Sequence, residues 1–283
     1  NCFVLEKTRK LKGIISLKDL LVSEGNQLIG DIMNSDFLKV HTGDDQEYVA
    51  EMIKKYDLLS IPVVDNEERL VGIVTVDDAI DVLEEENNED FEVMAAMKPS
   101  EESYMETSVL GLSRNRIVWL LILMISSSIT QLIINSFEDV ISTVIILSSF
   151  IPMITDTGGN AGSQSSTMVI RGMATGEIEL KDVFKVLFKE FRVSLICGGI
   201  LCLVNFVKLV LLNKVSYQIS FVVSVSLFFT VVIAKVVGGL LPIGAKKLKL
   251  DPALMASPLI TTIVDSLALV VYFLLASAIL KIS

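Results

Sequence analysis

The sequence contains few of the residues on which many soluble enzymes depend. Among its 283 residues, one is a histidine, three are cysteines and 7% are aromatic. The cysteines show no CxxC spacing, which argues against a cysteine-based metal site and against a disulfide framework. The sequence also lacks a phosphate-binding loop of the type Gly-x-x-x-x-Gly-Lys-(Ser/Thr), and no nucleophile is paired with a general base. We therefore expect the protein not to be an enzyme.

Charged residues are also scarce, at 20%, whereas 52% of the residues are hydrophobic and the mean hydropathy is +0.62. Such a composition is typical of a membrane protein. The charge is unevenly divided: residues 1–110 hold 10 basic and 25 acidic residues, a net charge of −15, and residues 111–283 hold 14 and 9, a net charge of +5. This division predicts at least two domains. Because nucleic acids bind to basic surfaces, the acidic part argues against a nucleic-acid partner and favours a cation.

Five apolar stretches are long enough to cross a bilayer as helices, which takes roughly 20 residues for a hydrocarbon core of about 30 Å. They cover residues 116–135, 139–157, 193–213, 218–241 and 252–280. Ten basic residues flank these stretches on one side: Arg114, Arg116, Arg171, Lys181, Lys185, Lys189, Arg192, Lys246, Lys247 and Lys249. The positive-inside rule places that side and the acidic N-terminal half in the cytoplasm, with the C-terminus outside. Residues 177–192 are predicted to form either an amphipathic helix on the inner membrane surface or an extension of the third stretch.

The acidic half contains an internal repeat, in which residues 11–20 align with residues 70–79 at an offset of 59. Each copy is predicted to form a strand, a turn, a strand and a helix, and the pattern Gly-x-(Ile/Val)-(Ser/Thr)-x-x-Asp occurs at Gly13–Asp19 and at Gly72–Asp78. This pattern resembles a pair of cystathionine-β-synthase (CBS) domains with the first one truncated. We expect residues 1–25 to be the C-terminal remnant of the first CBS domain and residues 26–85 to be the second, with the natural protein extending further upstream.

The CBS resemblance implies that Thr75 and Asp78 hold the phosphate and ribose of a nucleotide such as ATP. The alternative is that both residues only cap the following helix. Nine acidic residues then fall between Asp77 and Glu92 without a lysine or arginine, and Glu86, Glu89 and Asp90 share one face of a helix. This run is either a binding surface for divalent cations, which prefer oxygen ligands, or a solvated acidic face. Residues 86–114 are predicted to be an acidic connecting helical segment and residues 115–283 a helical membrane domain.

Two sets of polar residues lie at four-residue intervals within the apolar stretches. Ser257, Thr261 and Asp265 form one set, and Asp156, Asn160 and Gln164 form the other, in a glycine-rich segment that permits close helix approach or local unwinding. An acid at the centre of a membrane helix costs about 2.5–3.5 kcal/mol, so Asp265 is expected to face a polar cavity or a partner. We interpret the two sets as the lining of a pore. The alternatives are an ion pair of Asp265 with Lys235, and interhelical hydrogen bonds of Asn160 and Gln164.

The motifs Thr157–Ser165 and Asp251–Leu254, followed by Pro258, Thr262 and Asp265, resemble those of the MgtE family of bacterial magnesium channels. The resemblance implies an α/β CBS-type cytoplasmic domain followed by an all-α membrane domain of five transmembrane helices. It implies a homodimer in the bacterial plasma membrane, with one ion path between the subunits. Asp265 is then the residue that binds hydrated Mg²⁺ in the pore, with Thr261, Asn160 and Ser257 beside it. The resemblance also implies that intracellular Mg²⁺ closes the channel by binding to acidic residues of the N-terminal half. The implied ligands are Asp81, Glu86, Glu89, Asp90, Asp57 and Glu47.

Three other functions are weighed against this one. A secondary transporter that exchanges Mg²⁺ for H⁺ or Na⁺ remains the nearest alternative, since Asp265 is suited to carrying a proton. An intramembrane aspartyl protease needs two facing membrane aspartates, and the sequence places only one near the centre of an apolar stretch. A regulatory CBS protein anchored in the membrane needs one membrane helix rather than five.

Overall fold

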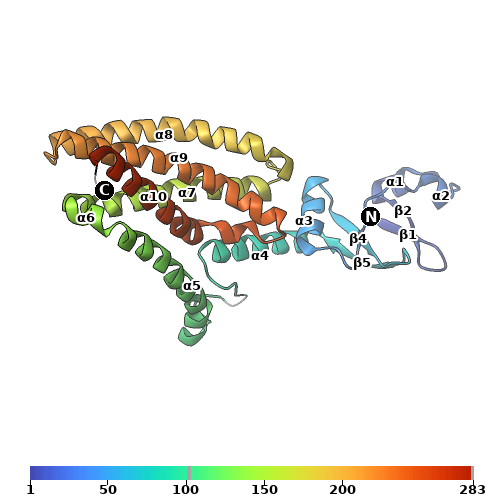
Figure 1. Ribbon diagram of the computed structural model, residues 1–283. Coiled ribbons are helices and arrows are strands. Elements are labelled where there is room, and N and C mark those ends of the chain that lie inside the picture. Colours follow the sequence, from blue (N-terminus) through green and yellow to red (C-terminus); the bar gives the residue numbers. More distant parts are fainter. Residues whose placement is uncertain (101–102, 282–283) are drawn as a thin grey trace. The chain divides into compact units, whose positions relative to one another are not determined.

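The computed structural model describes residues 1–100 and 103–281, apart from the side chain of Ser257. The chain divides into two compact units, Asn1–Asn88 and Glu89–Ser283. The strands of the described residues all belong to the first unit, and the second is helical (Figure 1). This is the CBS-type domain with a small sheet, followed by a mostly helical region, that the sequence predicts.

The first unit contains two small sheets. Strand β1 (Cys2–Leu5) pairs with β2 (Leu11–Ile15), and a three-stranded sheet has the order β3 (Val40–His41), β4 (Ser60–Val64) and β5 (Leu70–Thr75). Strand β3 runs parallel to β4, and β4 is antiparallel to β5. The helices α1 (Leu17–Val22), α2 (Ile29–Ile32) and α3 (Gln46–Lys55) accompany them, together with α4 (Val76–Met94), whose last residues belong to the second unit. Apolar residues of β3, β4, α3 and α4 form the core of this unit.

The structure confirms the internal repeat down to its strand register. In the β1–β2 hairpin Val4 pairs with Gly13 and Leu5 with Leu11, and in the β4–β5 hairpin Val63 pairs with Gly72 and Val64 with Leu70. All four partners differ by the predicted offset of 59, and an irregularity occurs at the same place in both hairpins. Each hairpin leads directly into a helix, α1 or α4, whose first turn is capped by the Ser or Thr of the repeated pattern.

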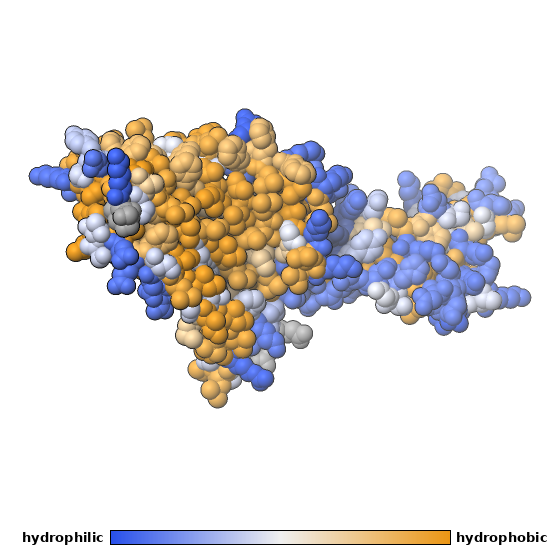
Figure 2. Space-filling view, in the orientation of Figure 1, coloured by the Kyte–Doolittle hydropathy of each residue, from blue (hydrophilic) through white to orange (hydrophobic). Residues whose placement is uncertain are grey.

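The second unit contains α5 (Val109–Ser136), α6 (Glu138–Thr143), α7 (Ile151–Ala174), α8 (Val183–Leu211), α9 (Tyr217–Lys247) and α10 (Ser257–Leu280). Short 3₁₀ segments lie at Ile145–Phe150, Leu180–Asp182 and Pro252–Met255. Among the described residues, α5, α8, α9 and α10, with the short segments before α8 and α10, are long and apolar enough to cross a membrane. Hydrophobic side chains cover the visible face of this unit (Figure 2).

The predicted bounds of the second membrane helix, residues 139–157, are wrong. That stretch contains α6, a break at Val144 and the 3₁₀ segment Ile145–Phe150, and the long helix α7 begins only at Ile151. The break is held by side chains: the Ser148 and Ser149 hydroxyls donate to nearby carbonyls within the segment, and Tyr272 Oη of α10 donates to the Leu147 carbonyl at 2.8 Å. For residues 177–192, the structure shows the extension, because α8 runs without interruption from Val183 to Leu211.

Glycines allow α7 to pack tightly against its neighbours α9 and α10. A Cβ at Gly158 would lie 2.7 Å from Thr230 Cγ2 of α9, and a Cβ at Gly162 would lie 2.8 Å from Ile260 Cγ2 of α10. Of the two roles predicted for these glycines, close approach is the one observed, since α7 remains helical throughout. The packing places α7 and α10, the helices that carry the two predicted polar sets, next to each other.

Candidate functional site

Asp265 lies in α10 where α7 comes closest to it. Its Oδ1 is buried and, within the described part of the chain, has no hydrogen-bond partner. Gly159 of α7 faces this region: a Cβ at residue 159 would lie 3.6 Å from Asp265 Oδ1, an ordinary contact, and 2.9 Å from Thr261 Cγ2, which is too close. A buried carboxylate oxygen without a donor is unfavourable unless another group satisfies it. The position therefore suits a ligand that supplies O–H donors or positive charge.

The polar set of α7 lies on the surface of this helix. Asp156, Asn160 and Gln164 are all exposed, whereas the intervening Gly158, Gly159, Ala161 and Gly162 are buried against the other helices. The helical period of 3.6 residues keeps the three polar side chains on one face. The carboxyl group of Asp156 lies close enough to that of Asp265 for the two groups to interact electrostatically. Polar side chains from α7 and α10 thus meet on one side of an otherwise apolar bundle.

The remaining predicted pore residues take different positions. The Thr261 hydroxyl donates to the Pro258 carbonyl at 2.9 Å, which leaves its oxygen free to accept further hydrogen bonds. Ser257 is the first residue of α10, and its side chain lies outside the described residues. The alternative ion pair of Asp265 with Lys235 is not among the ion pairs of the described residues. Lys235 Nζ instead donates to Gln164 Oε1 at 3.4 Å, so Gln164 does make an interhelical hydrogen bond.

One polar contact in this region was missed by the sequence analysis. The hydroxyl of Ser165, which is buried, donates to Glu190 Oε2 of α8 at 2.5 Å. Glu190 packs alongside Gly239 of α9, where a Cβ would lie 3.2 Å from Glu190 Cγ. Glu190 is the only acidic residue in α8, and this isolation among apolar and basic residues was the available signal.

In the first unit, Thr75 and Asp78 form a reciprocal cap at the start of α4. Thr75 Oγ1 donates to Asp78 Oδ2 at 2.5 Å, and the Thr75 amide donates to the same oxygen at 2.9 Å. These hydrogen bonds, chiefly the one from the Thr75 hydroxyl, hold the pKa of the Asp78 carboxyl below its ordinary value. Both residues therefore cap α4. Asp78 also lines a cavity of about 310 Å³ together with His41, Asp44 and Gln46, a volume in the range of small-ligand sites.

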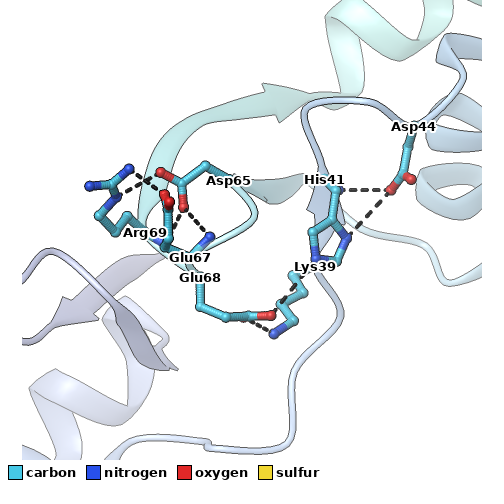
Figure 3. A network of polar contacts seen from close by, with 7 residues as sticks. All are labelled: Lys39, His41, Asp44, Asp65, Glu67, Glu68 and Arg69. Carbon is cyan, nitrogen blue, oxygen red and sulfur yellow. Dashed lines mark hydrogen bonds and ion pairs between the residues drawn. The ribbon is translucent and has the colours of Figure 1, made fainter.

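A charged network that the sequence analysis did not predict adjoins His41 (Figure 3). The His41 amide donates to Asp44 Oδ2 at 2.7 Å, and His41 Nε2 lies 3.8 Å from Glu68 Oε1. Glu68 also pairs with Lys39, and this contact lowers the pKa of the Glu68 carboxyl. Nearby, Arg69 forms ion pairs with Asp65 and Glu67. The network fixes the loop between β4 and β5 next to β3.

The predicted regulatory carboxylates are spread over α3 and α4. Four of them lie in α4: Asp81, Glu86, Glu89 and Asp90. Glu47 lies in the first turn of α3, and Asp57 follows α3 with a positive φ of 51°. Glu86 Oε1 accepts a hydrogen bond from Gln46 Nε2 at 2.8 Å. Within the described residues of a single chain, no three His, Cys, Asp or Glu side chains converge on a position that would hold a metal ion.

Two family models match parts of this chain. A model described as MgtE, a divalent cation transporter, matches residues 151–275, the segment that contains Asp156, Asn160, Gln164, Thr261 and Asp265. A CBS domain model matches residues 29–85. The chain contains an MgtE domain and a CBS domain.

Two MgtE relatives match nearly the whole chain. The chain is 38% identical over 283 residues to the magnesium transporter MgtE of Thermus thermophilus, a match that covers 99% of this chain and 62% of that protein. It is 38% identical over 276 residues to the MgtE of Bacillus subtilis, covering 98% and 60%. The chain thus spans about three fifths of the length of these relatives. Among solved structures, the cytosolic domain of the Mg²⁺ channel MgtE in complex with ATP is similar at 48% identity and a TM-score of 0.28, covering 28% of this chain and 32% of that one.

Proposed function

We propose that this chain forms the pore and an attached regulatory domain of a Mg²⁺ channel that admits Mg²⁺ to the cell. The observation that carries the proposal is the buried Oδ1 of Asp265, without a hydrogen-bond donor in the described residues, next to the exposed polar set of α7. A bilayer would penalise both features, because hydrocarbon satisfies neither a carboxylate nor an amide. A water-filled ion path along this surface removes both penalties.

The chemistry of the site suits Mg²⁺ in its hydrated form. Mg²⁺ loses water reluctantly and usually binds through one or two carboxylates while keeping most of its waters. Asp265 supplies a carboxylate, and Thr261 and Asn160 supply oxygen atoms that accept hydrogen bonds from those waters. Such an outer-sphere site binds the ion weakly enough to release it, which conduction requires. Ser257 would extend the same set at the start of α10.

A second copy of the chain completes the path. Asp156, Asn160 and Gln164 are exposed on a single chain, so they would face lipid if the protein were a monomer. Two copies related by a two-fold axis bring two such surfaces together around one polar path. The proposed assembly is therefore a homodimer in the bacterial plasma membrane, with the N-terminal unit in the cytoplasm and the C-terminus outside. The ten basic residues on one side of the helices support this orientation.

The membrane potential supplies the driving force for uptake. A charge of +2 gains about 4.6 kcal/mol for each 100 mV of inside-negative potential, twice the value for a single charge. Passive entry of Mg²⁺ therefore needs no coupled reaction. An exchanger that couples Mg²⁺ to H⁺ or Na⁺ is the competing function, and it differs in requiring a second ion gradient.

Regulation is assigned to the acidic first half of the chain. When intracellular Mg²⁺ is scarce, the acidic residues of two subunits repel one another, and when it rises the ions bridge them. The proposed ligands are Asp81, Glu86, Glu89, Asp90, Asp57 and Glu47, and residues 86–114 connect them to the pore. The absence of a three-ligand cluster in a single chain, within the described residues, favours bridging between chains over a closed site. The cavity beside Asp78 is the proposed binding site for ATP.

The test is Mg²⁺ influx into proteoliposomes under an imposed inside-negative potential, comparing the parent chain with Asp265→Asn. The matched control is Asp139→Asn, which makes the same change at an exposed position in α6. Influx that follows the potential without an H⁺ or Na⁺ gradient, and that falls at least tenfold only in Asp265→Asn, supports the channel. A requirement for a counter-ion gradient would establish the exchanger. Influx unaffected by Asp265→Asn would remove the aspartate from the ion path.

A further inference from the structure

Lys235 is a lysine buried inside the helical unit. Its exposed fraction is 6%, and it lies in α9 between the buried Ala234 and the apolar residues that follow it. The basic residues at the end of α9, Lys246 and Lys247, are exposed. At 1.5 Å per residue, Lys235 is about 18 Å along the helix from Lys247. A lysine so far from the helix end cannot extend its amine to the membrane surface as lysines near helix ends do.

Among the described residues, the polar contact that Lys235 makes is with a neutral side chain. Within the described residues, no carboxylate lies within ion-pair distance of it. Its hydrogen-bond partner is Gln164 Oε1, at 3.4 Å. Glu190, the acidic residue of the adjoining helix α8, accepts a hydrogen bond from Ser165 instead. An ammonium group has three donors, and one neutral amide oxygen satisfies only one of them.

The partner of Lys235 connects it to the surface that carries the candidate site. Gln164 is exposed on the same face of α7 as Asp156 and Asn160, one helical turn beyond Asn160. The amine of Lys235 therefore lies directly behind the amide of Gln164, on the buried side of this polar face. Its charge is opposite in sign to that of Asp265. Because the amine is buried in protein, its charge is screened less by water and salt than the charge of a surface lysine, and it acts on an ion that passes the amide of Gln164.

We infer that Lys235 is a specificity-determining residue of the ion path, where its positive charge behind Gln164 opposes each cation in proportion to that cation's charge. This inference rests on the proposed function, because it needs the polar face of α7 to line the path. Coulomb energy is proportional to the product of the two charges, so the barrier that Lys235 adds for Mg²⁺ is twice the barrier that it adds for Na⁺. Lys235 thus limits divalent flux more strongly than monovalent flux at the level of Gln164.

The experiment compares three variants of the full chain with the parent in proteoliposomes of one lipid composition at a fixed inside-negative potential. Lys235→Met removes the charge with little change of side-chain length, and Lys235→Arg keeps the charge. Lys185→Met is the matched control, because Lys185 is exposed and is paired with Asp182 at 2.7 Å. Initial influx is measured for Mg²⁺ at concentrations where influx is proportional to concentration, and for Na⁺ in solutions without divalent cations. Thermal unfolding in detergent verifies that each variant is folded.

The expected result is that Lys235→Met raises both influxes, and that the factor for Mg²⁺ is the square of the factor for Na⁺. A threefold rise for Na⁺ would accompany a rise of about ninefold for Mg²⁺. Lys235→Arg and Lys185→Met should stay close to the parent. Equal factors for the two ions, no rise, or the same change in Lys235→Arg would overturn the inference and leave Lys235 a packing role. If the parent responds to Asp265→Asn while Lys235→Met changes nothing, the inference fails and the proposed function stands; if the parent shows no Mg²⁺ influx, both fail.

Discussion

Gly238 of α9 lies directly against the backbone of Gly162 in α7. A Cβ at residue 238 would stand 2.3 Å from the Gly162 carbonyl oxygen, a distance at which backbone atoms would have to move. On another side, Gly162 faces Ile260 and Val264 of α10. Three helices therefore meet at this one position, and their separation depends on two residues without side chains.

The first prediction concerns this helix crossing. Gly238→Ala should destabilise the helical unit by about 1–3 kcal/mol, because overpacking a close contact costs more than the gain in helix propensity of about 1 kcal/mol. Gly244→Ala, in the same helix, has open space around its Cβ and should be neutral or stabilising. The measurement is the unfolding temperature of each variant in detergent. Equal temperatures for Gly238→Ala and the parent would show that α7 and α9 are further apart than described.

A second prediction tests whether the methyl group of Thr261, and not its hydroxyl group, limits the residue that fits at position 159. Gly159→Ala places a Cβ 2.9 Å from Thr261 Cγ2 and should displace α10 next to Asp265. Mg²⁺ influx should fall about tenfold, which corresponds to an added barrier of about 1.4 kcal/mol. Adding Thr261→Ser removes the methyl group that clashes and keeps the hydroxyl, so the double variant should recover most of the influx. A double variant no better than Gly159→Ala would contradict the steric explanation.

The third prediction tests the break before α7. Tyr272 is fully buried, and its hydroxyl donates to the Leu147 carbonyl. Tyr272→Phe leaves that carbonyl without this partner and should lower the free energy of unfolding by about 1–3 kcal/mol. Tyr217→Phe, at an exposed tyrosine in the first turn of α9, provides the control and should have little effect. Chemical denaturation in detergent measures the difference, and equal losses in both variants would argue against a role for this hydrogen bond.

A fourth prediction follows from the lowered pKa of Asp78. Above the ordinary aspartate pKa of 3.8 the carboxylate is ionised in both the folded and the unfolded chain, so its hydrogen bonds to Thr75 stabilise only the folded one. This contribution is lost as the pH falls through the lowered pKa of the folded protein. Thr75→Val should therefore weaken the protection of the first turn of α4 at pH 7, and the difference from the parent should shrink below pH 3.8.

Hydrogen exchange of the full chain, followed by mass spectrometry of the peptide that contains residues 70–80, measures this effect. Thr8→Val is the matched control, since Thr8 is exposed and donates only to Glu6. A difference between Thr75→Val and the parent that stays constant down to pH 2 would mean that the Asp78 carboxylate takes no part in the cap.

A fifth prediction addresses regulation. Replacing Glu86, Glu89 and Asp90 with Gln, Gln and Asn should shift the Mg²⁺ concentration that half-inhibits influx upward by at least fivefold, within the usual range of allosteric coupling. Influx in the absence of internal Mg²⁺ should be unchanged. The control replaces Glu24, Asp31 and Asp36, which are exposed residues outside α3 and α4, with their amides. If the control shifts the half-inhibiting Mg²⁺ concentration by the same factor, the effect depends on total negative charge and not on these three residues.

Much of the fold follows from local sequence patterns. The two hairpins share their register because the same alternation of apolar residues occurs twice, and register depends on that alternation. The fourth and fifth apolar stretches fall within the long helical segments that end at Lys247 and Leu280, and the third extends two residues beyond the end of α8 at Leu211. The four-residue spacing of Asp156, Asn160 and Gln164 predicts a polar stripe, and the three residues do share one face because α7 is an uninterrupted helix.

The features that the sequence analysis got wrong or missed depend on contacts between residues that are far apart in the sequence. Hydropathy alone joins residues 139–150 to the start of α7, because the hydrogen bond that supports the break comes from Tyr272, 125 residues after Leu147. The partners of Lys235 and Glu190 lie on different helices, so their spacing in the sequence carries no information about these contacts. Which of the two roles the glycines of α7 take also depends on Thr230 and Ile260, residues of other helices.

The crossing at Gly238 also restricts how this gene can change. Every single-nucleotide change that converts a glycine codon into another amino acid introduces a Cβ, and here a Cβ meets the backbone of a neighbouring helix rather than a side chain that can rotate away. No one-step mutation of this codon therefore leads to a residue that fits the present helix separation. A different residue can therefore become established at position 238 only together with a compensating displacement of α7.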